Sequence, residues 1–216
     1  MGLPVLRLAL LCGLTIGPAL ADPVSDGFAA YQRGDYLTAY RLCLPWARNG
    51  DSTAALILGL MYANGRGVPQ DNTRAAGWYG AAADAGDDVA ENNLGLMYAA
   101  GRGVRQSDSQ AAKLFWLAAN QGNPRAQYNL AVAYKDGKGV DQSYVHAYMW
   151  YSLSMTADWD AAIHAKAVRE RDDVAKLMTE AQIGEARADV AHWQPTVRRV
   201  GPRQQPSMID NPPSDR

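Results

Sequence analysis

The sequence contains few of the residues on which catalysis, disulfide bonding and nucleic-acid binding depend. Its 216 residues include 2 Cys, 3 His and 2 Phe. The 21 Lys and Arg nearly balance the 22 Asp and Glu, so no basic field is available to hold a nucleic-acid backbone. A mean hydropathy of -0.29 is too polar for a protein with several membrane spans. Because Val, Ile and Phe are sparse, the composition favours helices over a large β-sheet.

The first 21 residues are typical of a signal peptide. A basic start at Arg7 precedes the apolar stretch Leu8–Ile16, and Ala19 and Ala21 are the small residues that a signal peptidase reads. We place cleavage after Ala21. The alternative is an uncleaved membrane anchor, but the apolar run is short for one. We therefore expect a periplasmic or secreted protein with no stable membrane span after cleavage.

The middle of the chain repeats with a period of 36 residues. The repeated features are a Leu-Gly pair at Leu58, a tyrosine at Tyr62, a Gly-x-Gly-Val turn at Gly65 and an alanine at Ala75. Their later copies begin at Leu94 and Leu130, Tyr98 and Tyr134, Gly101 and Gly137, and Ala111 and Ala147. So many matches at fixed offsets indicate a solenoid of stacked units.

Each unit is predicted to be a pair of helices. Good N-cap residues precede each expected helix, namely Asp51, Asp87 and Asn123 for the first helices and Asp71, Ser107 and Ser143 for the second. Ser107 and Gln110 have the spacing of a capping box. Ala54, Leu58 and Tyr62 are four residues apart and predict a buried face. The first helix ends at a turn in which we expect Gly67 to have a positive φ.

Around the repeats, the sequence divides into five parts. These are a signal peptide at 1–21, a helix pair at 22–50, three repeats at 51–157, capping helices at 158–194 and a disordered Pro-rich tail at 195–216. The repeat phase is lost at Asp158, where a glycine is due. One longer helix is expected near Asp160–Leu177 and another after Thr179, and together they close the stack.

The repeat resembles the Sel-1-like repeat, a close relative of the tetratricopeptide repeat. The resemblance rests on two strings, Ala54-x3-Leu58-Gly59-x2-Tyr62-x2-Gly65-x-Gly67-Val68 and Ala75-x2-Trp78-Tyr79-x2-Ala82-Ala83-x2-Gly86. The later copies depart from them at Leu114, Ala131 and Ser154-Met155, which loosens the packing. The resemblance implies an all-α, right-handed solenoid that serves as a protein-binding scaffold. Many exported bacterial members are adaptors or modulators of envelope signalling and assembly.

Residues that could perform catalysis or bind a metal or cofactor do not form a suitable pattern. His146, His164 and His192 have no His or Cys partners at metal-ligand spacing. Once Cys12 leaves with the signal peptide, Cys43 is the one remaining cysteine, and its apolar helical surroundings favour a buried thiol. We therefore predict no catalytic, cofactor-binding or metal-binding residues, and no enzyme activity.

A binding groove is predicted along the first helices of the units, which normally line the concave side of such a stack. The side chains expected to face it are Leu56, Leu60, Asn92, Leu96, Tyr128, Val132 and Lys135. Their mixture of apolar groups, amides and one charge suits an extended peptide. The alternative is that part of this set packs between neighbouring repeats.

Two classes of function remain open. The first is a non-catalytic interaction scaffold or adaptor of the bacterial cell envelope, whose partner is a protein or peptide. The second is an envelope hydrolase acting on cell-wall or β-lactam substrates, a role linked to cysteine-rich relatives of the repeat. Those relatives carry a Cys pair in each repeat, and this chain has none. The sequence therefore favours the scaffold.

The signal-peptide assignment predicts the first residue of the exported protein. N-terminal sequencing of the protein isolated from its native cells should begin at Asp22, because Ala19 and Ala21 direct cleavage to the bond after Ala21. A full-length product that remains in the cytoplasm would contradict this assignment.

Overall fold

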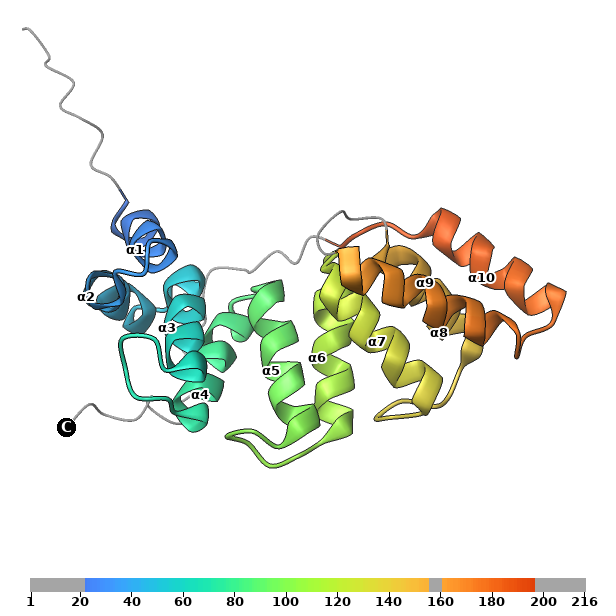
Figure 1. Ribbon diagram of the computed structural model, residues 1–216, viewed down its shortest axis with the longest axis horizontal. Helices are drawn as coiled ribbons and strands as arrows, with labels where there is room; N and C mark the ends of the chain where they lie inside the picture. Colours follow the sequence, from blue (N-terminus) through green and yellow to red (C-terminus); the bar gives the residue numbers. More distant parts are fainter. Residues whose placement is uncertain (1–21, 156–160, 197–216) are drawn as a thin grey trace, which may run out of the picture.

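The computed structural model describes residues 22–155 and 161–196, and these residues form ten α-helices and no strand. Helices α1 to α8 pack in successive pairs, and α9 and α10 both pack on α8. The helices stand side by side in a row that runs from α1 at one end to α10 at the other (Figure 1). This confirms the predicted all-α solenoid. The helices are α1 (Pro23–Gln32), α2 (Tyr36–Arg48), α3 (Ser52–Asn64), α4 (Asn72–Asp84), α5 (Asp88–Ala100), α6 (Asp108–Asn120), α7 (Pro124–Asp136), α8 (Tyr144–Ser154), α9 (Ala161–Ala175) and α10 (Glu180–His192).

The predicted N-caps are confirmed at the helices of all three repeats. The N-cap side chains accept backbone N–H groups of the first turn at α3 to α8, for example Asp51 from Ala54 at 2.8 Å. The capping box predicted at Ser107 is only half formed, since its hydroxyl accepts from Gln110 N–H at 3.3 Å without a returning bond from that glutamine's side chain. A complete capping box begins α10 instead, at Thr179.

The first glycine of each turn ends the first helix of its repeat. Gly65, Gly101 and Gly137 have φ values of 65°, 64° and 66°, a left-handed conformation that is costly for any residue with a Cβ. A glutamine five residues later holds the turn in place. Gln142 Nε2, for example, donates to the carbonyl of Lys135 at 2.8 Å, and Gln70 and Gln106 make the equivalent bonds.

The second glycine of each turn contacts the preceding unit. Gly67 has the predicted positive φ, 74°, and Gly103 and Gly139 have 70° and 73°. Gly103 lies against the backbone of Asn72, the first residue of α4, and Gly139 lies against that of Asp108, the first residue of α6. A Cβ on either glycine would overlap the backbone carbonyl group beneath it. These glycines therefore allow adjacent repeats to touch backbone to backbone.

The buried side chains form two apolar clusters with a polar seam between them. One cluster extends from Val24 to Met97 and includes the predicted face Ala54, Leu58 and Tyr62, while the other extends from Ala111 to Ala186. Side chains of α5, of α7 and of the link between α6 and α7 form the seam, and its buried polar residues are Glu91, Asn92, Asn123 and Gln127. The junction between the second and third repeats is thus joined by hydrogen bonds as well as by apolar packing.

Helices α9 and α10 close the stack on α8, as the sequence predicted. Val174 and Ala186 are buried there, and the Trp193 ring meets Trp150 edge to face with centroids 6.3 Å apart. The expected disordered tail is wrong in its first two residues, because Pro195 lies near Gly122 and Thr196 N–H donates to the Asn120 carbonyl at 2.7 Å. The signal peptide at 1–21, the junction at 156–160 and the tail from 197 onward lie outside the described residues.

The turn geometry predicts different costs for the same substitution at two glycines of one turn. Gly139→Ala and Gly137→Ala both place a Cβ at positive φ, which costs about 1–2 kcal/mol. Only the Cβ at 139 also overlaps the backbone of Asp108, since the Cβ at 137 would be 3.4 Å from its nearest neighbour, the Gln142 side chain. Urea unfolding should show a loss for Gly139→Ala at least about twice that for Gly137→Ala.

Equal losses of unfolding free energy in the two variants would contradict the proposed role of the second glycine. In that case its contact with the preceding helix would not limit how closely the repeats stack.

Candidate functional site

The predicted groove residues fall into three groups in the structure. Leu56 and Leu60 of α3 and Val132 of α7 are half-buried, while Leu96 of α5 keeps 37% of its surface exposed. These four side chains therefore keep part of their surface exposed, and their place in a binding groove stays a prediction. The remaining three, Asn92, Tyr128 and Lys135, are engaged by other parts of the chain.

The expectation that Asn92 lies on the groove surface is wrong. Its side chain is 2% exposed, and Asn129 Nδ2 donates to Asn92 Oδ1 at 2.8 Å. Neighbouring polar groups pair in the same way, because Gln121 Nε2 donates to the fully buried Glu91 at 2.8 Å. Asn92 is thus part of the polar seam between repeats, where an unpaired amide would be costly.

Tyr128 and Lys135 lie beneath helix α9. Lys135 Nζ forms an ion pair with Glu170 Oε2 at 2.6 Å, and this hydrogen bond raises the pKa of Lys135. Lys166 Nζ lies 5.4 Å from the centre of the Tyr128 ring. The capping helix therefore occupies the part of the groove that α7 was expected to offer near these two residues.

An apolar surface cavity of about 210 Å³ brings two of the predicted residues together. Leu96 and Val132, one repeat apart, line it between α5, α6 and α7. Its other apolar walls are Ala99, Ala111, Ala112, Phe115 and Ala133, and its polar rim is Asp108, Asn129 and Lys138. The contribution of α6 was not predicted, because the apolar pattern of that helix in the sequence indicates only a core face.

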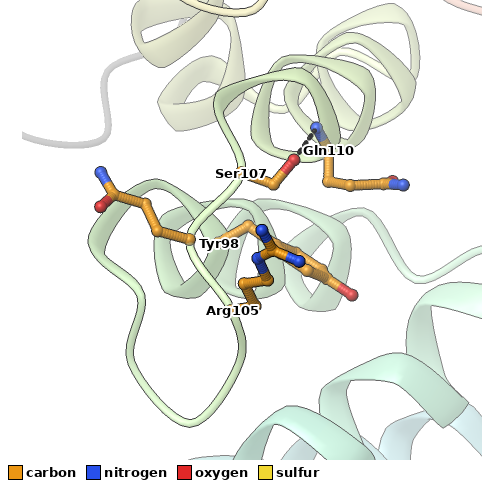
Figure 2. A pocket seen from close by; sticks show the side chains of 5 residues that line it. Tyr98, Arg105, Ser107 and Gln110 are labelled. Carbon is orange, nitrogen blue, oxygen red and sulfur yellow. Dashed lines mark hydrogen bonds between the residues drawn. The ribbon is translucent and has the colours of Figure 1, made fainter.

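A second, polar cavity of about 410 Å³ lies in the same repeat on the other side of the start of α6. Tyr98 from α5, Arg105 and Gln106 from the turn, and Ser107 and Gln110 at the start of α6 line it (Figure 2). None of these residues was predicted to form a site. A comparison of the three repeats, position by position, could have identified these residues from the sequence.

The geometry offers little support for catalysis in the described part of the chain. Cys43 is buried as predicted, and burial raises the pKa of its thiol to about 11, so the reactive thiolate is scarce at neutral pH. His146 Nδ1 is bonded to the Ser143 hydroxyl at 2.8 Å, and its ring stacks on Tyr134. Within residues 22–155 and 161–196, no three His, Cys, Asp or Glu side chains gather as metal ligands would.

The same described ranges contain no helix with the length and apolar character needed to cross a membrane.

Two solved structures show what this chain is similar to. The first is a protective antigen present in uropathogenic Escherichia coli strains, which displays an SLR fold; it is 23% identical, with a TM-score of 0.55. That similarity covers 79% of this chain but only 44% of the antigen, so this chain spans less than half of its length. The second is a Sel1 repeat protein from Oxalobacter formigenes, 25% identical with a TM-score of 0.59, over 78% of this chain and 74% of that one. No curated protein matches the chain.

The repeats themselves match a described family. The Sel1 repeat matches three times in succession, at residues 52–87, 88–123 and 124–154, which are the three helix pairs α3–α4, α5–α6 and α7–α8. Sel1 repeat proteins are generally non-catalytic scaffolds for protein interaction, and the repeats therefore suggest a protein partner. Residues 52–154 are therefore three Sel1 repeats, and the fold is that of Sel1 repeat proteins.

Proposed function

We propose that this protein is a scaffold of the bacterial cell envelope that binds an extended peptide segment of a partner protein. The apolar cavity lined by Leu96 and Val132 carries this proposal. It is concave, it lies between two repeats, and its apolar walls meet a polar rim of Asp108, Asn129 and Lys138. An apolar side chain of a peptide would fill the cavity, while the rim would pair with the polar groups of the peptide backbone.

The position of this cavity favours a peptide that crosses the repeats. Leu60 of α3 is one period before Leu96, at the equivalent position of the preceding repeat, and Leu56 lies one helical turn before Leu60; both are half-buried. In the opposite direction, α9 covers Tyr128 and Lys135. The binding surface is therefore proposed to run from α7 across α5 to α3, with its end at α9.

A location outside the cytoplasm is part of the same proposal. It is supported by the signal-peptide pattern at residues 1–21, with Arg7, the apolar stretch Leu8–Ile16 and the small residues before Asp22. The partner is then a protein of the periplasm or of the extracellular surface.

The proposal predicts that the cavity can be disabled without unfolding the chain. In the variant Leu96→Gln with Val132→Thr, two side chains of the cavity become polar with little change in size. Affinity for the partner should fall by about 1–3 kcal/mol if the pair is at the centre of the interface. The measurement is capture of the partner from an envelope fraction by the chain that begins at Asp22, with melting temperatures recorded in parallel.

Two control variants separate binding from stability. Leu37→Gln changes a leucine of α2 that is 62% exposed and distant in sequence from the cavity, so it should leave capture unchanged. Val24→Ala removes buried methyl groups of α1, at the end of the stack distant from the cavity, and should lower the melting temperature, while the protein that remains folded still binds. Equal capture of the same partner by the wild type and the cavity variant would place the binding surface elsewhere.

A further inference from the structure

The three repeats differ in what covers the tyrosine near the end of their first helix. In the first repeat, Arg74 Nη1 donates to the Tyr62 hydroxyl at 3.2 Å, and its guanidinium carbon lies 5.4 Å from the ring centre. In the third repeat, the His146 ring stacks on Tyr134 with centroids 4.9 Å apart. Each of these repeats therefore fills the space beside its tyrosine with a flat side chain of its own.

The equivalent space in the second repeat is open. One period of 36 residues relates Gln110 to Arg74 and to His146, and Gln110 is exposed. Among the described residues, no ring pair or cation–π contact involves Tyr98. The polar cavity of about 410 Å³ lies beside it, with Arg105, which also lines the cavity, drawn in front of the tyrosine in this view (Figure 2). The sequence change from Arg or His to Gln thus coincides with the appearance of a cavity.

The walls of this cavity also differ in charge from the other two repeats. Arg105 occupies the position of Pro69 in the first repeat and of Asp141 in the third. Ser107 occupies the position of Asp71, the carboxylate that pairs with Arg74 at 3.4 Å in the first repeat. Compared with the first repeat, the second therefore has an additional guanidinium on the wall of the cavity and lacks the acid that would accompany a bound cation. The third repeat also has a serine at this position, Ser143, but has Asp141 in place of the guanidinium.

The five residues that line the cavity include one cation and no acid. Asp108 is the next residue along the chain, but it lines the apolar cavity instead. The start of α6 is already capped by Ser107, whose hydroxyl accepts from Gln110 N–H. Recognition of a charged ligand would therefore depend on Arg105, which is exposed and has no ion-pair partner among the described residues.

We propose that the cavity beside Tyr98 binds a carboxylate side chain, Asp or Glu, of the partner peptide. Arg105 would donate charged hydrogen bonds to the carboxylate, as guanidinium groups commonly do. The methylene groups of the acidic side chain would lie against the Tyr98 ring, in the space that Arg74 and His146 fill in the neighbouring repeats. A cationic side chain is disfavoured there because Arg105 would repel it. This inference rests on the proposed peptide-binding function and names the chemistry of one contact.

Nuclear magnetic resonance with short peptides tests this contact directly. The chain that begins at Asp22, labelled with ¹⁵N, is titrated with acetyl-Ala-Glu-Ala-amide and with the matched peptide acetyl-Ala-Gln-Ala-amide. The glutamate peptide should shift the signals of Arg105 Nε–H and of the Gln110 side chain in a saturable way, and the glutamine peptide should not. Arg105→Gln should weaken binding about tenfold or more, the factor expected when a charged hydrogen bond is lost.

Two further variants distinguish this site from general surface attraction. Arg102→Gln removes an exposed guanidinium of the same turn that does not line the cavity, so it should leave peptide binding unchanged. The double variant Ser107→Asp with Gln110→Arg installs the pair that the first repeat uses to cover Tyr62. It should abolish binding of the glutamate peptide, while the rest of the spectrum remains that of the folded protein.

The proposed contact would be contradicted if the two peptides shifted the signals of the protein equally, or if Arg105→Gln and Arg102→Gln weakened binding of the glutamate peptide equally. It would also be overturned if the double variant at 107 and 110 bound the glutamate peptide as well as the wild type does. None of these results would affect partner capture through Leu96 and Val132, so failure of the contact and failure of the proposed function are separate outcomes.

Discussion

The stack depends on the contact between the second turn glycine and the backbone of the preceding repeat. Gly103 rests on Asn72 and Gly139 on Asp108, each at the first residue of the preceding repeat's second helix. Because backbone touches backbone there, the separation of the repeats does not depend on which side chains surround the contact. Side chains elsewhere on the repeat can therefore vary without changing how the units stack, and this freedom is what a binding surface requires.

The parts of the fold that depend on local chemistry could be predicted from the sequence. Asp51 and Ser107 could be predicted as N-caps because a side-chain oxygen near a helix start pairs with free backbone N–H groups. The positive φ of Gly67 could be predicted because a residue without a Cβ adopts that conformation at little cost. Asn92 could not be placed in this way. Its burial depends on Asn129, which lies 37 residues further along the chain and on another helix.

The capping helix explains the other part of the site that the sequence did not reveal. Lys135 and Tyr128 are on the helix and at the positions expected to face the groove, but Glu170 and Lys166 of α9 reach them from a segment that has lost the repeat phase. Without a period, the sequence offers no rule for where α9 packs. Leu96 and Val132 are 36 residues apart, so the period alone places them at equivalent positions of neighbouring repeats, where they line one cavity.

The second repeat is where the side chains depart most from an even array. Its α5 contributes buried Glu91 where the first repeat has Ala55, and Gln121 compensates for the burial of that carboxylate with a hydrogen bond. Buried polar groups cost free energy unless they are paired. The bond from Asn129 to the buried Asn92 crosses from the third repeat to the second, and so it helps to fix the orientation of these two repeats. The two cavities lie on either side of the start of α6, since adjacent residues, Ser107 and Asp108, line different ones. A seam that holds α5, α6 and α7 in one arrangement also holds the walls of both cavities, and so it keeps apolar and charged recognition at a fixed spacing.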